Sequence, residues 1–134
     1  MTIQLSTTVR DAQNDAIETA ISTTPWLDIR TGAQPANCGS ADAGSELEHM
    51  ALPSDWLGAS SGGVKAKAGT WSSTVDAAGT AAHFRIKNLA DTVCHMQGSI
   101  TATSGGGDME LDNIVLASGQ TLTVNTFTLT AGNP

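Results

Sequence analysis

Residues 121–130, TLTVNTFTLT, decide the fold, because apolar side chains alternate with threonine along most of this stretch. A period of two is typical of a strand that buries one face. The apolar positions are Leu122, Val124, Phe127 and Leu129. The alternation changes phase near Asn125 and Thr126, and a single extra residue of this kind predicts a bulge or a sharp bend.

Similar short alternating stretches occur through the rest of the chain, separated by turns rich in glycine and serine. They lie at residues 26–30, 46–52, 64–68, 81–87 and 93–101, and around Met109 and Leu111. Their period places Phe84 and Ile86 inward and Arg85 and Lys87 outward, and it places Lys65 and Lys67 together on one face. We expect a mainly β fold, either a β-sandwich or a jelly-roll-like barrel.

One N-terminal segment has helical spacing instead. Its apolar positions recur every three or four residues: Val9, Ala12, Ala16, Ile17, Ala20 and Ile21. They form one stripe opposite the polar positions Arg10, Gln13, Asn14 and Glu18, which predicts an amphipathic helix packed on the sheet. Thr8 is the expected N-cap, and Pro25 ends the helix near Ser22. Residues 1–134 therefore read as one β-rich domain with a short N-terminal arm and a helix over about residues 8–22.

Composition limits what the protein does. The 134 residues carry a net charge of -7 with only six Lys and Arg, which argues against nucleic-acid binding. No segment approaches the roughly 18 to 20 consecutive apolar residues of a membrane span, and the N-terminus lacks the apolar run of a secretory signal. We expect synthesis in a cytoplasm and no membrane partner.

An acidic set near the C-terminus is the strongest candidate for metal binding. Period-two spacing puts Asp108, Glu110 and Asp112 on one strand face, beside Asn113, where oxygen ligands could gather a Ca²⁺ ion. The alternative is a solvated strand face that pairs with a basic strand. Because the glycine and distal glutamate of an EF-hand loop are missing, we predict no metal and no cofactor.

The cysteines and histidines show no catalytic spacing. Cys38 and Cys94 are far apart in the sequence, and they could pair only if the fold brings their Cα atoms to within about 7 Å. Free thiols are the expectation, with pairing left open. Cys94 and His95 are adjacent in an expected strand and so point to opposite faces. With His49 and His83 elsewhere, and no nucleophile motif, we predict that the protein is not an enzyme.

Large apolar residues near turns and termini are candidates for a partner interface. Trp56 is the first choice, because it lies between a Pro-Ser-Asp turn and a Gly-Ser stretch. The full set of candidates is Trp56, Trp26, Ile3, Leu5, Phe127 and Leu129, and packing in the core explains the tryptophans equally well. Strands at either terminus could add to the sheet of a neighbouring subunit.

Four stretches resemble small virion structural proteins of tailed bacteriophages: residues 30–38 (RTGAQPANC), 52–56 (LPSDW), 78–86 (AGTAAHFRI) and 127–133 (FTLTAGN). Among these, capsid decoration (cement) proteins are the most similar. The resemblance implies a homo-oligomer, a dimer or trimer, that binds the major capsid protein on the virion surface. A tail, neck or baseplate component is an alternative, as is a carbohydrate-binding module that uses exposed tryptophan.

Overall fold

The computed structural model describes residues 2–132 and contains, within them, one helix and eleven short strands. In chain order these elements are α1 (Thr7–Ile21), β1 (Trp26–Arg30), β2 (Glu46–Ala51), β3 (Val64–Ala66), β4 (Ser72–Thr74), β5 (Gly79–Thr80), β6 (His83–Lys87), β7 (Cys94–Ala102), β8 (Met109–Leu111), β9 (Val115–Leu116), β10 (Thr121–Thr123) and β11 (Thr128–Thr130). The prediction of a mainly β chain with one N-terminal helix is confirmed.

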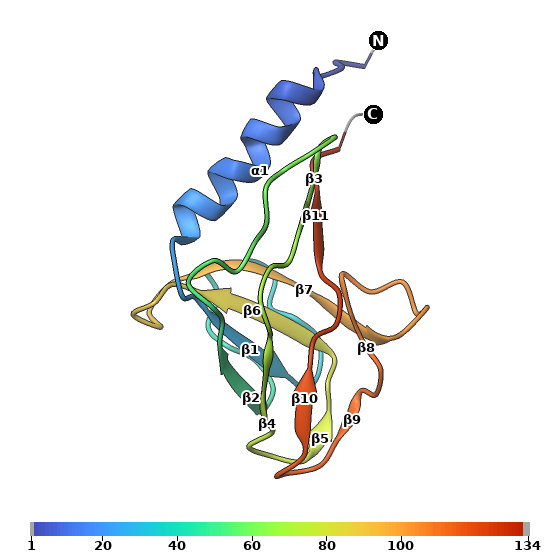
Figure 1. Ribbon diagram of the computed structural model, residues 1–134. Coiled ribbons are helices and arrows are strands. Elements are labelled where there is room, and N and C mark those ends of the chain that lie inside the picture. The colour runs from blue at the N-terminus through green and yellow to red at the C-terminus, as the bar shows by residue number, and fades with distance from the viewer. Residues whose placement is uncertain (1, 133–134) are drawn as a thin grey trace.

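The largest sheet has five strands in the order β2-β1-β6-β7-β8 and curls into half a barrel (Figure 1). Its pairs are antiparallel except β7 with β8, which run parallel. Three two-stranded ladders, β4–β10, β3–β11 and β5–β9, complete the β structure. Strands β9, β10 and β11 thus pair with three separate partners and build no second large sheet. The expected sandwich or jelly roll is therefore replaced by a half-barrel with small ladders.

An aromatic cluster lies at the centre of the core. The rings of Trp56 and Trp71 are 6.1 Å apart, those of Trp71 and Phe127 are 5.4 Å apart, and Phe84 meets Phe127 edge-on at 5.7 Å. Such tilted and edge-on contacts add to the free energy gained from burying the rings. The indole N–H of Trp56 donates to the carbonyl oxygen of Ser22 at 3.0 Å, which joins the end of α1 to this cluster.

The phase change near Asn125, from which we expected a bulge or a sharp bend in one strand, is a break between two strands. Residues 124–127 are not in a strand, and β10 before them pairs with β4 whereas β11 after them pairs with β3. Helix α1 and the β3–β11 ladder extend together from one end of the half-barrel, and we call them the projection (Figure 1). The rest of the molecule is the body.

Two of the basic side chains that the strand period places opposite apolar ones are buried. Arg85 is only 1% exposed and Lys65 only 3% exposed. Arg85 does lie on the face of the sheet opposite Phe84 and Ile86, but residues 37–44 cover that face. Lys65 is covered by α1. A strand period assigns side chains to two faces and does not tell which face a loop or a helix will cover.

Candidate functional site

Helix α1 binds the rest of the chain through its polar side. Asn14 is 1% exposed, and its amide donates to the carbonyl oxygen of Gly63 at 3.0 Å and to the Ser60 hydroxyl at 3.2 Å. The Asp11 carboxylate accepts hydrogen bonds of 2.8 Å from the Ser60 hydroxyl and from the Gly63 amide. These hydrogen bonds hold the pKa of Asp11 below its usual value. The turn that leads into β3 is thereby fixed to the helix.

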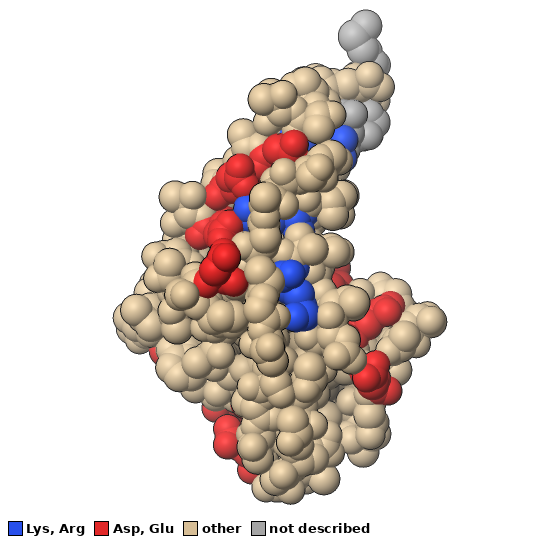
Figure 2. All heavy atoms as spheres, in the orientation of Figure 1, with Lys and Arg blue, Asp and Glu red and all other residues tan. Residues whose placement is uncertain are grey.

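A buried lysine extends this polar attachment. Lys65 Nζ lies 2.7 Å from Asp15 Oδ1 and 2.8 Å from Glu18 Oε2. Burial alone would lower the pKa of Lys65, but its hydrogen bonds to Asp15 and Glu18 outweigh burial and raise that pKa. Figure 2 shows acidic side chains along α1 and basic side chains next to them. Near the start of α1, Arg10 Nε donates to Ala131 at 2.9 Å.

The apolar stripe of α1 consequently faces away from the body. Val9 is 45% exposed and Ile17 is 37% exposed, and the alanines at positions 12, 16 and 20 are exposed as well. Ile21, at the end of the helix, is the member of the stripe that enters the core. The prediction that the stripe packs on the sheet is wrong, because the helix contacts a narrow ladder and a polar turn whose hydrogen-bonding groups select its polar side.

The N-terminus of the helix also differs from expectation. The N-cap is Ser6, not Thr8, and its hydroxyl accepts a hydrogen bond of 3.3 Å from the amide of Val9. The segment before it is extended and carries Ile3, which is 80% exposed. An exposed isoleucine therefore precedes the exposed stripe of α1 in the chain.

Strand β11 has a free edge in the described part of the chain, because it pairs only with β3. On the β3 side, the carbonyl oxygen of Phe127 accepts a hydrogen bond from the amide of Lys67. The amide of Ala131 donates a hydrogen bond to the carbonyl oxygen of Gly63. Since hydrogen-bonding direction alternates along a strand, the backbone groups of Thr128 and Thr130 point away from β3. A groove of about 430 Å³ lies along this strand, and its apolar lining is Phe84, Met96, Phe127 and Leu129.

A cluster of charged side chains lies around Asp28, on the face of the five-stranded sheet that is opposite Phe84 and Ile86. Asp28 is fully buried, with its carboxylate 2.5 Å from His49 Nδ1 and 2.9 Å from Lys87 Nζ. The His49 ring stacks on Trp26 with 4.1 Å between centroids. A second nitrogen of His49, Nε2, lies 3.8 Å from the Asp91 carboxylate. The imidazole is thus held between two carboxylates and an indole.

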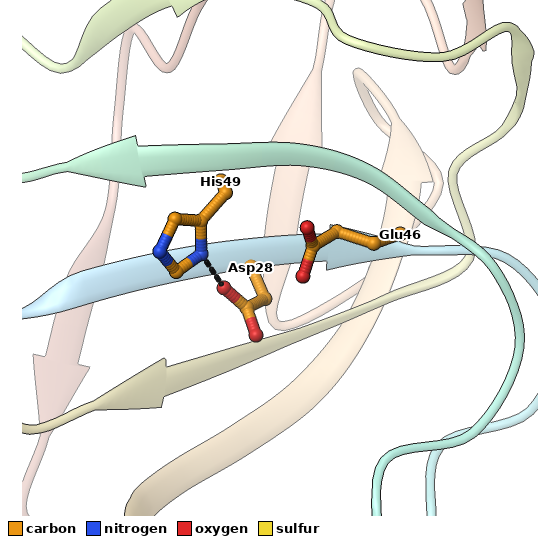
Figure 3. A group of neighbouring side chains, drawn as sticks. All are labelled: Asp28, Glu46 and His49. Atoms are coloured by element: carbon orange, nitrogen blue, oxygen red, sulfur yellow. Dashed lines mark hydrogen bonds and ion pairs between the residues drawn. The ribbon is translucent and has the colours of Figure 1, made fainter. Parts of the chain in front are cut away.

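Asp28, Glu46 and His49 bring three potential metal ligands within 4.8 Å of one another (Figure 3). The surrounding charges do not fit a metal ion. Arg30 Nη1 lies 3.1 Å from Glu46 Oε2, and Lys87 Nζ is in contact with Asp28. Cations already occupy the oxygens that a metal would need, and they would repel it. The arrangement fits an ion-pair network that stabilises the sheet.

The covering segment, residues 37–44, is fastened by the same network. The Arg85 guanidinium donates to the carbonyl oxygens of Cys38 at 2.7 Å and Ser40 at 3.0 Å, and to the Asp42 carboxylate at 2.7 Å. Arg30 Nε donates to the carbonyl oxygen of Ala43 at 2.9 Å. Arg85 therefore satisfies main-chain acceptors of a loop that has no strand of its own.

The tryptophan candidates for a partner interface are not on the surface as expected. Trp56 is fully buried in the core, so the prediction that it faces a partner is wrong. Its short turn folds inward because the large ring gains more from the aromatic cluster than from solvent. Trp26 is half-buried between His49 and the carbonyl oxygen of Leu89, to which its indole donates at 3.0 Å.

The interface candidates near the two termini differ in their exposure to solvent. Phe127 is 4% exposed and belongs to the core, which corrects its assignment to an interface, and Leu129 is half-buried beside it. Ile3 is exposed and Leu5 is half-buried. Val9 and Ile17 are exposed but were not among the interface candidates. Helical periodicity identifies an apolar stripe, and it does not indicate that the polar side of the helix will be buried instead.

The acidic residues that suggested a Ca²⁺ site accept hydrogen bonds from other residues of the chain. Asp108 accepts hydrogen bonds from the amide and hydroxyl of Ser99, at 2.8 and 2.9 Å. Glu110 accepts from the amides of Ser104 and Gly106, both at 3.1 Å, and Asp112 accepts from Asn125 at 2.9 Å. Each carboxylate fixes a different turn, and the described residues do not bring the three together around one point.

The histidines are likewise in separate surroundings. His83 is buried with Nδ1 2.8 Å from the carbonyl oxygen of Gly32, His49 is bound to Asp28, and His95 is exposed. By contrast, Cys38 and Cys94 line one pocket together with Arg85 and Lys87. The structure thus brings together the two cysteines whose pairing the sequence left open.

No family model matches this chain, and neither a curated protein nor a solved structure matches it. Among the described residues, no helix is both long enough and apolar enough to cross a membrane.

Proposed function

We propose that this protein is a viral structural protein, a capsid decoration or cement protein that binds and stabilises the major capsid shell of a tailed bacteriophage. The observation that supports it most is the orientation of α1, which exposes Val9 and Ile17 to solvent. Burial of this exposed apolar surface against another molecule would be favourable. The stretches of sequence that resemble phage structural proteins favour a virion as the assembly in which the stripe of α1 is covered.

The exposed stripe of α1 serves self-association in this proposal. Apolar residues repeat along several turns of the helix, so the same stripe on another copy is a self-complementary partner. Ile3, in the arm before the helix, adds another exposed apolar side chain. A dimer or trimer packed through α1 would leave the bodies free to contact the shell.

The free edge of β11 serves contact with the major capsid protein. An extended segment of that protein would add a strand beside Thr128 and Thr130 and place side chains in the adjoining groove. Backbone hydrogen bonds supply affinity in this mode of binding, and side-chain pockets supply specificity. Many such contacts over a shell would resist the outward pressure of packaged DNA.

Sedimentation of the purified protein tests self-association. We expect a dimer or trimer for the natural chain and a monomer for the double variant Val9→Glu/Ile17→Glu, because charge on the stripe opposes its burial. Thr8→Glu is the matched control, since Thr8 is exposed on the same helix outside the stripe. A monomeric natural chain at high concentration would overturn the role given to α1.

Addition of the protein to phage heads that lack it tests the position in the virion. Cosedimentation with heads, and a rise in the temperature at which the heads release DNA, are the expected results. Thr128→Pro removes a backbone donor on the free edge and is expected to abolish binding, whereas Thr128→Val keeps that donor and is expected to bind. Binding to tails instead of heads would favour the alternative of a tail, neck or baseplate component.

A further inference from the structure

Cys38 and Cys94 come from distant parts of the sequence and meet at one open pocket of about 550 Å³. Cys38 belongs to the segment that covers the sheet, and its carbonyl oxygen is held by Arg85 at 2.7 Å. Cys94 begins β7 and pairs in register with Lys87 of β6, at an irregularity in the ladder. Both residues are partly exposed, so a small molecule can reach them.

The two cysteines line this pocket together with Arg85, whose guanidinium is buried beside them. Burial, together with the neighbouring Cys94 thiol, raises the pKa of Cys38 to about 11. The thiolate is the nucleophile in thiol chemistry, so the raised pKa makes Cys38 the slower thiol to attack. We therefore assign the first attack to Cys94 and the second to Cys38.

We propose that Cys38 and Cys94 are a thiol–disulfide exchange site that accepts a small-molecule disulfide of the glutathione type and closes into an intramolecular disulfide. The Cys94 thiolate attacks one sulfur of the small disulfide, forming a mixed disulfide and releasing one small thiolate. Cys38 then loses its proton to solvent and attacks the Cys94 sulfur, which releases the second small thiolate. The two protein thiols are oxidised and the small disulfide is reduced to two thiols.

Closure would tie the covering segment covalently to the start of β7. The segment is already fixed by Arg85 and Arg30, so little further ordering is needed to bring the sulfurs together. A crosslink between distant positions stabilises the native state by restricting the unfolded chain. By the same linkage, folding favours formation of the bond, and for a closed loop of this size the expected preference is on the order of 10³-fold.

The test equilibrates the natural chain with reduced and oxidised glutathione, once folded and once in denaturant. Intact mass and non-reducing peptide mapping give the ratio of disulfide to dithiol. We expect a product lighter by two hydrogen atoms, with Cys38 joined to Cys94, and a ratio about 10³-fold higher in the folded protein. A ratio no higher than in denaturant, or a folded product that keeps glutathione on either cysteine, would overturn the proposal.

Two single variants separate the steps. Cys38→Ser is expected to retain one glutathionyl group on Cys94, because the second attack is missing, and Cys94→Ser is expected to react far more slowly. Raising the pH is expected to accelerate closure of the mixed disulfide in the natural chain, as Cys38 becomes ionised. Equal rates for the two variants would contradict the order of attack, and a closure rate that does not change with pH would contradict Cys38 as the second nucleophile.

Discussion

The side-chain amide of Asn14, in the middle of helix α1, donates a hydrogen bond of 3.0 Å to the carbonyl oxygen of Gly63 in the turn before β3. Asn14 is among the most buried side chains of the helix, while apolar neighbours on the opposite side are exposed. A buried amide that loses its acceptor is costly, so this bond determines which side of the helix faces the ladder.

Asn14→Ala is expected to destabilise the protein by about 2 kcal/mol, because it removes the hydrogen bonds to Gly63 and Ser60 that hold the turn to the helix. Urea unfolding followed by circular dichroism measures the change. Gln13→Ala is the control, since Gln13 is exposed on the same helix and its loss is expected to change stability by less than about 0.5 kcal/mol. Equal effects of the two substitutions would contradict the role of Asn14.

Glu48 supplies a pH-dependent prediction. Its side chain is 2% exposed on the core side of β2, where it accepts a hydrogen bond from the Ser73 hydroxyl. Burial raises the pKa of Glu48 more than the bond from Ser73 lowers it, and the Asp76 carboxylate adds to the rise. The folded state therefore prefers the protonated acid, and stability falls as the pH rises through this raised pKa.

Glu48→Gln removes that cost at neutral pH and is expected to raise the free energy of unfolding by about 1 kcal/mol at pH 7. The gain should shrink as the pH falls toward 4, where the natural side chain is protonated in both states. Thermal unfolding at a series of pH values measures it. A gain that is independent of pH would show that the charge of Glu48 is not responsible.

Asp42 is expected to show the opposite pH dependence. Burial would raise its pKa, but the hydrogen bond and charge of Lys87, with the charges of Arg30 and Arg85, lower it. The stabilisation is present above the ordinary pKa, about 4, and is lost as the pH falls through the lowered value. Asp42→Asn should cost about 1–2 kcal/mol at pH 7 and progressively less below about pH 4, measured by urea unfolding at each pH. If the loss of stability in Asp42→Asn were the same at every pH, the charge of Asp42 would not be its cause, and packing alone would explain it.

Gly44→Ala tests the fit of the covering segment. Gly44 has a φ of +67°, and an added Cβ would lie 1.9 Å from the carbonyl oxygen of Thr31. We expect a loss of more than about 3 kcal/mol, because backbone atoms must move as well as adopt a strained φ. Gly32→Ala has a similar φ of +74° but open space, so it should cost only about 1 kcal/mol. Thermal unfolding compares the two.

Much of the β structure was predictable from local pattern. The alternation at residues 26–30 and 81–87 identified β1 and β6, and the phase change near Asn125 identified the break between β10 and β11. These features depend on neighbours in the chain. The pairing of each late strand with a different early partner depends on contacts distant in sequence, so the half-barrel with small ladders could not be told from a sandwich.

The candidate surfaces were predicted less well, for a related reason. Trp56 could serve a core or an interface equally, and burial was decided by an aromatic cluster assembled from three separate parts of the chain. The stripe on α1 was identified correctly as apolar. The direction in which the stripe faces depends on the contacts of Asn14 with Gly63 and of Lys65 with Asp15. These contacts join residues distant in the sequence, so helical periodicity does not predict them.

The break at residues 124–127 has a mechanical consequence. On each side of it, a backbone hydrogen bond joins the two chain segments that run from body to projection: Val124 to Trp71, and Lys67 to Phe127. The rings of Trp71 and Phe127 pack between those bonds. Bending the projection would therefore stretch two backbones and separate two buried rings at once. We therefore expect the projection to resist bending at this junction, so that a force applied at its tip reaches the core of the body.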